Sequence, residues 1–391
     1  MNQNGQSGHK RLNFVDNLRI FLTSLVILHH AAIGYGGYGG WFLYQADFSP
    51  IDDFTIILLT FFVAINQSYF MSIFFLFAGY FTVQSYNRKG PLIFYRDRFI
   101  RFLIPILLYL IFLNPLLNLM LLKGAYEVET DYFILFEDNL TNIWNGIGHL
   151  WFLFALLLFS IGYGVYRSIN GESNQLAQAG HEKISFPSQK LILVSIGGLS
   201  LITFIIRLEY AIGETELFGF QFAHFTHYLF SFIIGIVSYQ KQWHHALSWE
   251  RIKPYALTGL LLVPAALVFL ISLADFSTAA PFDPFIGGFT YQSFLYVVVE
   301  SIALICFTIT LLYLFQAYFN FQNGFTQEIA QSCYTGYIIH PLVVISLMIP
   351  LLSVSIFPLG KFVIVSTLSL ALVFSISFLI RQIPFAKRIL G

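Results

Sequence analysis

Ten long apolar stretches divide the 391-residue sequence and limit its fold more than any other feature. Each is close to the ~20 residues that an α-helix needs to cross the hydrocarbon core of a bilayer. Strands of a membrane barrel are shorter and alternate in polarity, so the pattern excludes a β-barrel. We therefore predict an all-α polytopic membrane protein with about ten transmembrane helices, at residues 17–34, 55–84, 99–122, 147–167, 189–207, 222–240, 255–273, 291–317, 333–352 and 360–380.

The composition agrees with that fold and argues against several other classes of protein. Hydrophobic residues make up 57% of the chain and charged residues 10%, against about 25% charged residues in soluble domains. A formal net charge of zero gives no indication of a nucleic-acid partner. Cys306 and Cys333 lie in or beside apolar stretches and predict neither a disulfide framework nor a metal site. The partner that the composition does predict is the lipid bilayer.

The basic residues are distributed unevenly between the two sides of the predicted membrane. With the N-terminus in the cytoplasm, sixteen of the twenty Lys and Arg residues lie on the cytoplasmic side. The outer side holds only Lys123, Arg207 and Lys361, and the remaining residue is Arg19 within the first stretch. This asymmetry follows the positive-inside rule, which the reverse orientation would violate. We predict that both termini are cytoplasmic, in agreement with an even number of helices.

A polar stretch, INGESNQLAQAGHEKISFPSQK at residues 169–190, separates the fourth and fifth predicted helices. Its composition predicts a flexible cytoplasmic linker. The two parts that it separates show no internal repeat, and no segment has the composition of a separate soluble domain. We expect one membrane domain over residues 1–391.

The first apolar stretch carries or adjoins four ionisable residues, Asp16, Arg19, His29 and His30. Arg19 and His30 are eleven positions apart, which is about three helical turns and ~16 Å, so they lie on one face. Asp16 shares that face, whereas His29 points about 100° away. Ionisable residues on an inward face of a membrane helix are candidates for function. The structural alternative is that Arg19 pairs with Asp16 near the helix end and that the histidines hydrogen-bond to neighbouring helices.

The spacing in this stretch resembles the first helix of the membrane family known as acyltransferase type 3: an Asp, two residues, an Arg, ten residues and a His. Four later phrases resemble the same family in the same order, namely FFLFAGYF (74–81), RFIRFLIP (98–105), GHLWFLFALLLF (148–159) and GYIIHPLVV (336–344). The third phrase resembles the branch that includes the succinyltransferase of osmoregulated periplasmic glucans. The resemblance extends from Asp16 to the tenth stretch, and the second histidine, His29, departs from the family's pattern.

This resemblance implies a membrane-bound O-acyltransferase of the bacterial cytoplasmic membrane. It would move an acyl group of the acetyl or succinyl class from cytoplasmic acyl-CoA to a hydroxyl of an extracytoplasmic carbohydrate or glycolipid. A hydroxyl is a weak nucleophile at neutral pH, so His30, the motif histidine, is the candidate general base. Arg19 and His149 are candidates for aligning the substrates or stabilising the oxyanion, and Asp16 for fixing Arg19. We expect no bound cofactor and no metal.

The basic run NRKGPLIFYRDRFIR at residues 87–101 lies on the side where an acyl-CoA donor would bind. This donor carries several phosphate charges, and guanidinium groups match phosphate oxygens well. Arg98 and Arg101 belong to a family-like phrase and are the candidate donor-binding residues. For Arg88, Lys89 and Arg96 the positive-inside signal is an equally good explanation.

Three further residues are candidates for the site. Tyr337 and His340 belong to the last family-like phrase, and Glu300 lies within the eighth apolar stretch without an evident partner. A different class of function also stays open, a transporter or flippase in which Arg19, His30 and Glu300 relay protons or bind an anionic substrate. Transporters often contain paired repeats with broken helices, and the sequence shows neither.

Two groups of residues have a chemical and a structural explanation, and the structural one is favoured for both. His224 and His227 have a spacing that suits a metal, but no third ligand is evident, so we expect interfacial packing. Trp41, Tyr44 and Phe48 are able to stack on sugar rings, but an aromatic belt at the membrane interface is the simpler explanation, and we favour it.

Overall fold

The computed structural model describes residues 12–142, 147–170, 186–278 and 280–390. Helices form the regular secondary structure of these residues, as predicted for an all-α protein. Within the described ranges, nine helical segments are long and apolar enough to cross a membrane. Most of the predicted linker at 169–190 lies outside the described residues, as do Lys10, Arg11 and Lys183.

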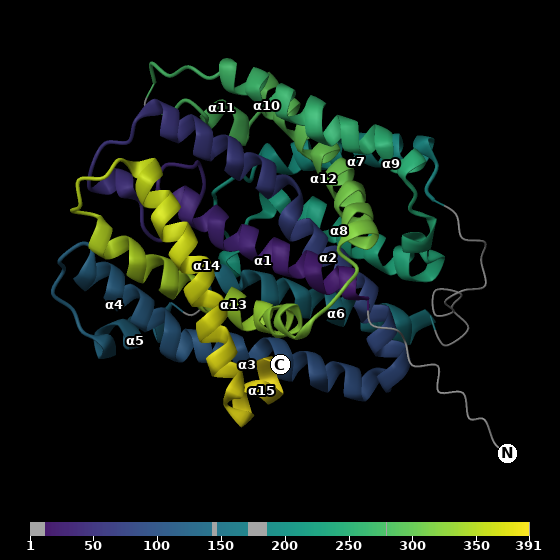
Figure 1. Cartoon of the computed structure of the whole chain (residues 1–391), viewed down its shortest axis with the longest axis horizontal. Helices are drawn as coiled ribbons and strands as arrows, with labels where there is room; N and C mark the ends of the chain where they lie inside the picture. Colours follow the sequence, from purple (N-terminus) through teal and green to yellow (C-terminus); the bar gives the residue numbers. More distant parts are fainter. Residues whose placement is uncertain (1–11, 143–146, 171–185, 279, 391) are drawn as a thin grey trace.

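Figure 1 shows the arrangement of the helices. In chain order they are α1 (Asn13–Gly34), α2 (Asp53–Arg98), α3 (Ile104–Leu108), α4 (Asn114–Gly124), α5 (Tyr132–Thr141), α6 (Trp151–Asn170), α7 (Gln189–Arg207), α8 (Phe225–Lys241), α9 (Trp249–Leu257), α10 (Val263–Ser272), α11 (Asp283–Ile286), α12 (Tyr291–Tyr318), α13 (Gly324–Met348), α14 (Pro358–Gln382) and α15 (Pro384–Leu390). Three π-helical turns, Phe99–Leu103, Tyr109–Leu113 and Thr258–Leu262, join α2 to α3, α3 to α4 and α9 to α10.

The ten predicted stretches correspond to nine segments because two of them fall within one helical run, Asp53–Gly124. A run of 72 residues is far longer than the ~30 Å core of a bilayer requires. Gly90, at φ 72° and ψ 169°, interrupts it immediately before Pro91. A left-handed φ favours glycine, and no atom lies within 4 Å of the place that a Cβ would take. This break leaves room for two spans, the second of which continues through α3 and α4 (Figure 1).

Short polar signals begin several of the helices. The carboxylate of Asp52 accepts a hydrogen bond of 2.9 Å from the backbone N–H of Thr55 and so caps α2. Asn323 and Thr326 form a reciprocal capping box at the start of α13. These caps satisfy backbone N–H groups that have no partner within the helix, so they fix where α2 and α13 begin.

Helix α1 lies in the interior of the bundle, where it contacts α2, α12, α13 and α14 (Figure 1). Leu18, Leu22 and Ile27 are completely buried. The polar side chains of Asp16 and His29 are also buried, so they face other helices rather than lipid. A helix that carries ionisable groups is tolerated in a membrane when those groups face the protein interior, as they do in α1.

Helices α2 and α8 pack against each other at two glycines. A Cβ on Gly79 would lie 2.0 Å from the backbone oxygen of Phe232, and one on Gly235 would lie 2.1 Å from that of Leu76. Small residues allow membrane helices to approach this closely. The contact fixes α8, which follows the short turn Phe222–His224, against α2.

Candidate active site

Two cavities approach each other inside the bundle. The first, of about 400 Å³, is named the histidine pocket because four imidazoles line it, those of His29, His30, His149 and His224. The second, of about 860 Å³, is named the arginine pocket and is lined by Asp16, Arg19, Arg98, Arg101 and Tyr334, among others. Val26 of α1, Met71 of α2 and Tyr337 of α13 line both cavities. These three side chains therefore form a common wall between the two pockets.

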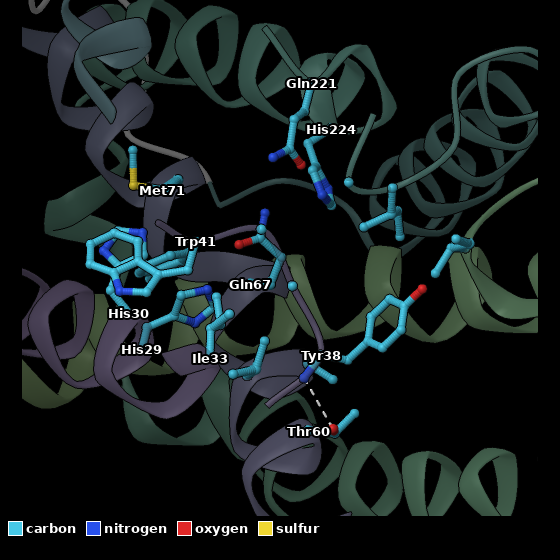
Figure 2. A pocket seen from close by; sticks show the side chains of 18 of the residues that line it. His29, His30, Ile33, Tyr38, Trp41, Thr60, Gln67, Met71, Gln221 and His224 are labelled. Atoms are coloured by element: carbon cyan, nitrogen blue, oxygen red, sulfur yellow. Dashed lines mark hydrogen bonds between the residues drawn. The ribbon is translucent and has the colours of Figure 1, made fainter. Parts of the chain in front are cut away.

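His30 lies near the end of α1, where its ring is held between two other rings. One face stacks on Trp41, with ring centroids 4.1 Å apart and planes inclined by 13°. The Nδ1 atom of His30 lies 2.9 Å from Nε2 of His340 on α13. Figure 2 shows the rings of His30 and Trp41 side by side at the edge of the histidine pocket. Trp41 therefore lines the same cavity as His30, and its membrane-interface position stays a prediction.

The hydrogen-bond partners assign the protons of this imidazole pair. Nδ1 of His340 lies 2.6 Å from the carbonyl oxygen of Tyr337, which only accepts hydrogen bonds, so this nitrogen carries a proton. In neutral His340 the other nitrogen, Nε2, is then an acceptor, and Nδ1 of His30 is the donor to it. The lone pair of neutral His30 is left on Nε2. No hydrogen bond to this atom is formed within the described part of the chain, so Nε2 is available as a base.

His149 completes the group from a different part of the chain. It lies in the short turn Gly148–Leu150, where Gly148 adopts a left-handed φ of 52°. Its Nε2 donates to the carbonyl oxygen of Ile338 over 3.0 Å, and its ring meets that of His340 edge-on with centroids 5.2 Å apart. The Tyr337 hydroxyl donates to the carbonyl oxygen of His149. The proton of His149 is therefore engaged by the protein, and this residue locks the turn of α13 that holds His340.

His29 also lines the histidine pocket, although helical geometry directs it about 100° away from His30. Its ring packs on Phe70 with centroids 4.8 Å apart and meets His30 edge-on at 5.6 Å. The residue is 4% exposed, and its Nδ1 is buried without a hydrogen-bond partner among the described residues. His29 is thus a neighbour of His30, but it lacks the orienting imidazole that His30 has.

The arginine pocket contains the other predicted side chains. The guanidinium group of Arg19 lies 3.6 Å from the carboxylate of Asp16. Arg98 stacks over Phe94 and Phe102 at 5.0 and 5.6 Å, and Arg101 stacks over Tyr334 at 5.5 Å. In the part of the chain that the structure describes, no carboxylate lies within salt-bridge distance of Arg98 or Arg101.

A third cavity, of about 560 Å³, adjoins the arginine pocket, and Arg98 and Arg101 line both. It is named the basic vestibule, and its other charged residues are Arg88, Lys89, Arg96, Asp97 and Arg388. Lys89 pairs with Asp97 at 2.5 Å, which leaves a large excess of positive charge. The basic run of the sequence therefore surrounds a cavity. Its cytoplasmic placement stays a prediction.

Glu300 has partners that the sequence did not reveal. Its carboxylate lies 2.7 Å from the guanidinium group of Arg207, and both side chains are almost completely buried. His224 and His227 approach the same carboxylate at 3.4 and 4.0 Å. His224 and His227, predicted to pack at the membrane interface, are buried together with Arg207 around Glu300. The outer side of the membrane stays a prediction for Arg207. The sequence feature that could have revealed this cluster was Glu300, because an acidic residue in an apolar stretch requires a partner within a membrane.

This arrangement bears on two alternatives that the sequence left open. Glu300 belongs to a cluster with Arg207, whereas Arg19 pairs with Asp16 in the arginine pocket. Arg19, His30 and Glu300, the three residues of the transporter alternative, therefore do not form one continuous chain of contacts. Within the described residues, no three His, Cys, Asp or Glu side chains converge in a way that would hold a metal ion.

Comparison with known proteins agrees with the geometry. Glucans biosynthesis protein C of Escherichia coli O139:H28 (strain E24377A / ETEC) is 26% identical over 243 residues, which cover 61% of this chain and 60% of that protein. The protein of the same name from E. coli strain K12 is 26% identical over 235 residues, with 59% and 58% covered. The aligned part of the chain thus spans about three fifths of the length of these relatives. No solved structure matches the chain significantly.

A family model described as an acyltransferase domain matches residues 12–381. That range begins one residue before α1 and ends in the last turn of α14, so it contains both pockets and the wall between them. The chain belongs to the acyltransferase 3 family of multi-pass membrane proteins.

Proposed function

We propose that the protein is a membrane-bound O-acyltransferase that moves an acyl group of the acetyl or succinyl class. The donor would be acyl-CoA on the cytoplasmic side of the bacterial cytoplasmic membrane, and the acceptor a hydroxyl of an extracytoplasmic carbohydrate or glycolipid. The observation that carries this proposal is the common wall of two chemically different cavities. Among the described residues, one cavity has an imidazole nitrogen without a hydrogen-bond partner and the other has two arginines without a carboxylate partner.

The arginine pocket and the basic vestibule suit the donor. Coenzyme A carries several phosphate charges, and Arg98 and Arg101 have N–H groups that no carboxylate of the described residues occupies. The two arginines line both the vestibule and the arginine pocket. From there the thioester arm would extend toward the wall formed by Val26, Met71 and Tyr337.

The histidine pocket suits the acceptor hydroxyl. Nε2 of His30 would take the hydroxyl proton as the acceptor oxygen attacks the thioester carbonyl carbon. The carbon–sulfur bond then breaks, and the imidazolium of His30 returns the proton to the coenzyme A thiolate. The imidazole is oriented throughout by His340, which is in turn held by the carbonyl oxygen of Tyr337.

The E. coli relatives are named for glucan biosynthesis, which supports a carbohydrate as the acceptor. A carbohydrate is rich in hydroxyl groups, and the lining of the histidine pocket offers Trp41 and Tyr38 as rings on which a sugar face can stack. This support is independent of the charges of the arginine pocket.

The test uses sealed proteoliposomes of known orientation. Labelled acetyl-CoA or succinyl-CoA is supplied on the side of the basic vestibule, and a glucan oligosaccharide is enclosed on the opposite side. We expect acylated oligosaccharide in the enclosed compartment and none with His30→Ala. Product that forms only when both substrates share one compartment would rule out transfer across the wall, and a wild-type protein that acylates no glycan or glycolipid would refute the function itself.

A further inference from the structure

The buried cluster around Glu300 adjoins the histidine pocket but is not needed for the proton transfer described above. Arg207 ends α7, Glu300 lies in the middle of α12, and His224 lies in the turn before α8. Arg207 binds Glu300 at 2.7 Å, and its Nε donates to the carbonyl oxygen of Ala223 over 3.1 Å. Burying an ion pair removes two charges from water at a considerable cost, so its presence in a membrane domain indicates a function beyond packing.

His224 connects this cluster to the cavity. It is 3% exposed, and it lines the histidine pocket together with Gln221, whereas neither Arg207 nor Glu300 does. Figure 2 shows His224 and Gln221 next to each other on one side of the pocket. Nδ1 of His224 is engaged by the cluster, but Nε2 forms no hydrogen bond with any described residue. The ion pair thus holds one nitrogen of an imidazole whose other nitrogen is left for a ligand.

The partners of Nδ1 determine what Nε2 can do. Arg207 Nη2 lies 3.2 Å from Nδ1 and only donates hydrogen bonds, so Nδ1 is the acceptor of this bond. The proton of neutral His224 then lies on Nε2. As a result, Nε2 is left as a donor for a ligand, which suits the oxygen of a hydroxyl group.

The charge of the pocket narrows the ligand further. None of the described residues that line the histidine pocket is an Asp, Glu, Lys or Arg, whereas the arginine pocket has Asp16 and three arginines. Arg207 and Glu300 neutralise each other behind His224. The polar groups that face the cavity are hydroxyls, amides and imidazoles, such as Gln67, whose amide donates to Tyr228 over 3.2 Å. A pocket of this kind has no fixed charge with which to select a phosphate or a carboxylate.

We propose that His224, oriented by Arg207 and Glu300, is a subsite that binds the acceptor as a neutral sugar through its hydroxyl groups. This inference rests on the proposed function and adds the chemical class of the acceptor and the residues that recognise it. His224 binds the acceptor, and Arg207 and Glu300 are positioning residues. The same sugar could come from a free glycan or from the head group of a glycolipid.

His227 provides a matched control within the same cluster. Its Nδ1 lies 4.0 Å from Glu300 and its Nε2 lies 3.3 Å from the hydroxyl of Ser301, but it does not line the histidine pocket. If the cluster only held helices together, His224→Gln and His227→Gln would have similar effects. If His224 binds the acceptor, only His224→Gln should change the KM for the acceptor.

The experiment measures initial rates with purified full-length protein in detergent, with acetyl-CoA or succinyl-CoA as donor. The acceptors are a neutral glucan oligosaccharide, the same oligosaccharide with carboxylate groups, and a glycolipid with the neutral sugar as its head group. We expect His224→Gln to raise the KM for neutral acceptors about 3- to 10-fold, because one or more hydrogen bonds to the acceptor are lost. The KM for the donor should be unchanged. Glu300→Gln should do the same more weakly, and His227→Gln should not.

Gln221→Ala keeps the proposal testable if His224→Gln fails to accumulate, because Gln221 is a half-buried residue on the same side of the pocket. It too should raise the acceptor KM alone. An unchanged acceptor KM in the pocket variants that accumulate, or an equal preference of the wild type for carboxylated and neutral acceptors, would overturn the subsite while acyl transfer itself survives. Wild-type protein that transfers no acyl group to any acceptor would overturn both. Of the two neutral acceptors, the free oligosaccharide and the glycolipid, the one with the lower KM identifies the source of the sugar.

Discussion

The histidine pocket and the arginine pocket share a wall but differ in nearly every chemical respect. One presents imidazoles, amides and aromatic rings without a charged residue among its described lining, and the other presents three arginines and one aspartate. Arginine N–H groups suit anions, whereas the first lining suits neutral hydroxyls. Under the proposed function, this difference would separate the donor from the acceptor by charge, and the two would meet at the shared wall of Val26, Met71 and Tyr337.

The largest effect should follow from removing the base on the histidine side. We expect His30→Ala to lower the rate of acyl transfer by about 10²- to 10⁴-fold, because general base catalysis contributes that much. The protein should still accumulate in the membrane, since the ring is only half-buried. Acylation of glycans, measured by mass spectrometry on cells that express each variant, is the readout.

His29→Ala is the matched control for this prediction. The two histidines are neighbours in α1 and line the same pocket, but only His30 has the imidazole of His340 at 2.9 Å. The loss in His29→Ala should therefore be much smaller. Equal losses in the two variants, or full activity in His30→Ala, would show that His30 is not the general base.

A smaller loss should follow from removing the residue that orients His30. His340→Ala leaves the Nδ1 proton of His30 without its acceptor, so both tautomers of His30 become accessible, and we expect about a 10- to 100-fold lower kcat. His340→Gln offers a side-chain oxygen as the acceptor and should recover part of the rate. Similar rates in His340→Ala and His340→Gln would show that this hydrogen bond does not set the tautomer.

Substitutions of the arginines in the arginine pocket should weaken binding of the donor. Arg98→Ala and Arg101→Ala each remove a guanidinium group from the junction of two basic cavities, so we expect about a 10-fold weaker binding of acyl-CoA for each. Higher salt should weaken donor binding to the wild type as well, because it screens the phosphate charges. Titration of the detergent-solubilised protein with acyl-CoA measures both effects.

The same measurement tests the difference between the two pockets. Arg98→Ala and Arg101→Ala should leave the KM for a neutral acceptor unchanged, since neither residue lines the histidine pocket. Unchanged donor binding in both variants would reduce these arginines to signals of membrane orientation. A parallel change in both KM values would show that the two cavities act as one.

The sequence predicted the helices better than it predicted the site. Apolar stretches of about 20 residues require helices whatever their neighbours are, so each of the ten predictions falls on a helix of the structure. The grouping of His30, His149, Tyr337 and His340 needs contacts between α13, α1 and the turn before α6, which no local pattern encodes. Resemblance to a family supplied these four residues one by one, without their contacts.

Arg207 shows why the remaining residues were missed. The positive-inside rule counts charges in loops, and by that count Arg207 is an outer residue at the end of a helix. In the structure it is completely buried against Glu300 of α12, 93 positions later in the sequence. Trp41 was considered for sugar stacking but given less weight, because an aromatic residue after a membrane helix suits an interfacial belt as well as it suits a pocket.

The smallest effect we expect concerns the wall itself. Met71 is 5% exposed and lines both pockets, so a larger and stiffer side chain there should hold the donor and the acceptor farther apart at the wall. Met71→Phe should lower kcat several-fold and leave the KM for each substrate nearly unchanged, because neither pocket loses a binding group. Met71→Leu conserves the volume and should behave like the wild type. Thermal unfolding of both variants in detergent distinguishes a local change at the wall from a general loss of stability. A rise in only one KM would place Met71 in that substrate's pocket alone, and the meeting point of donor and acceptor would then have to lie elsewhere along α1.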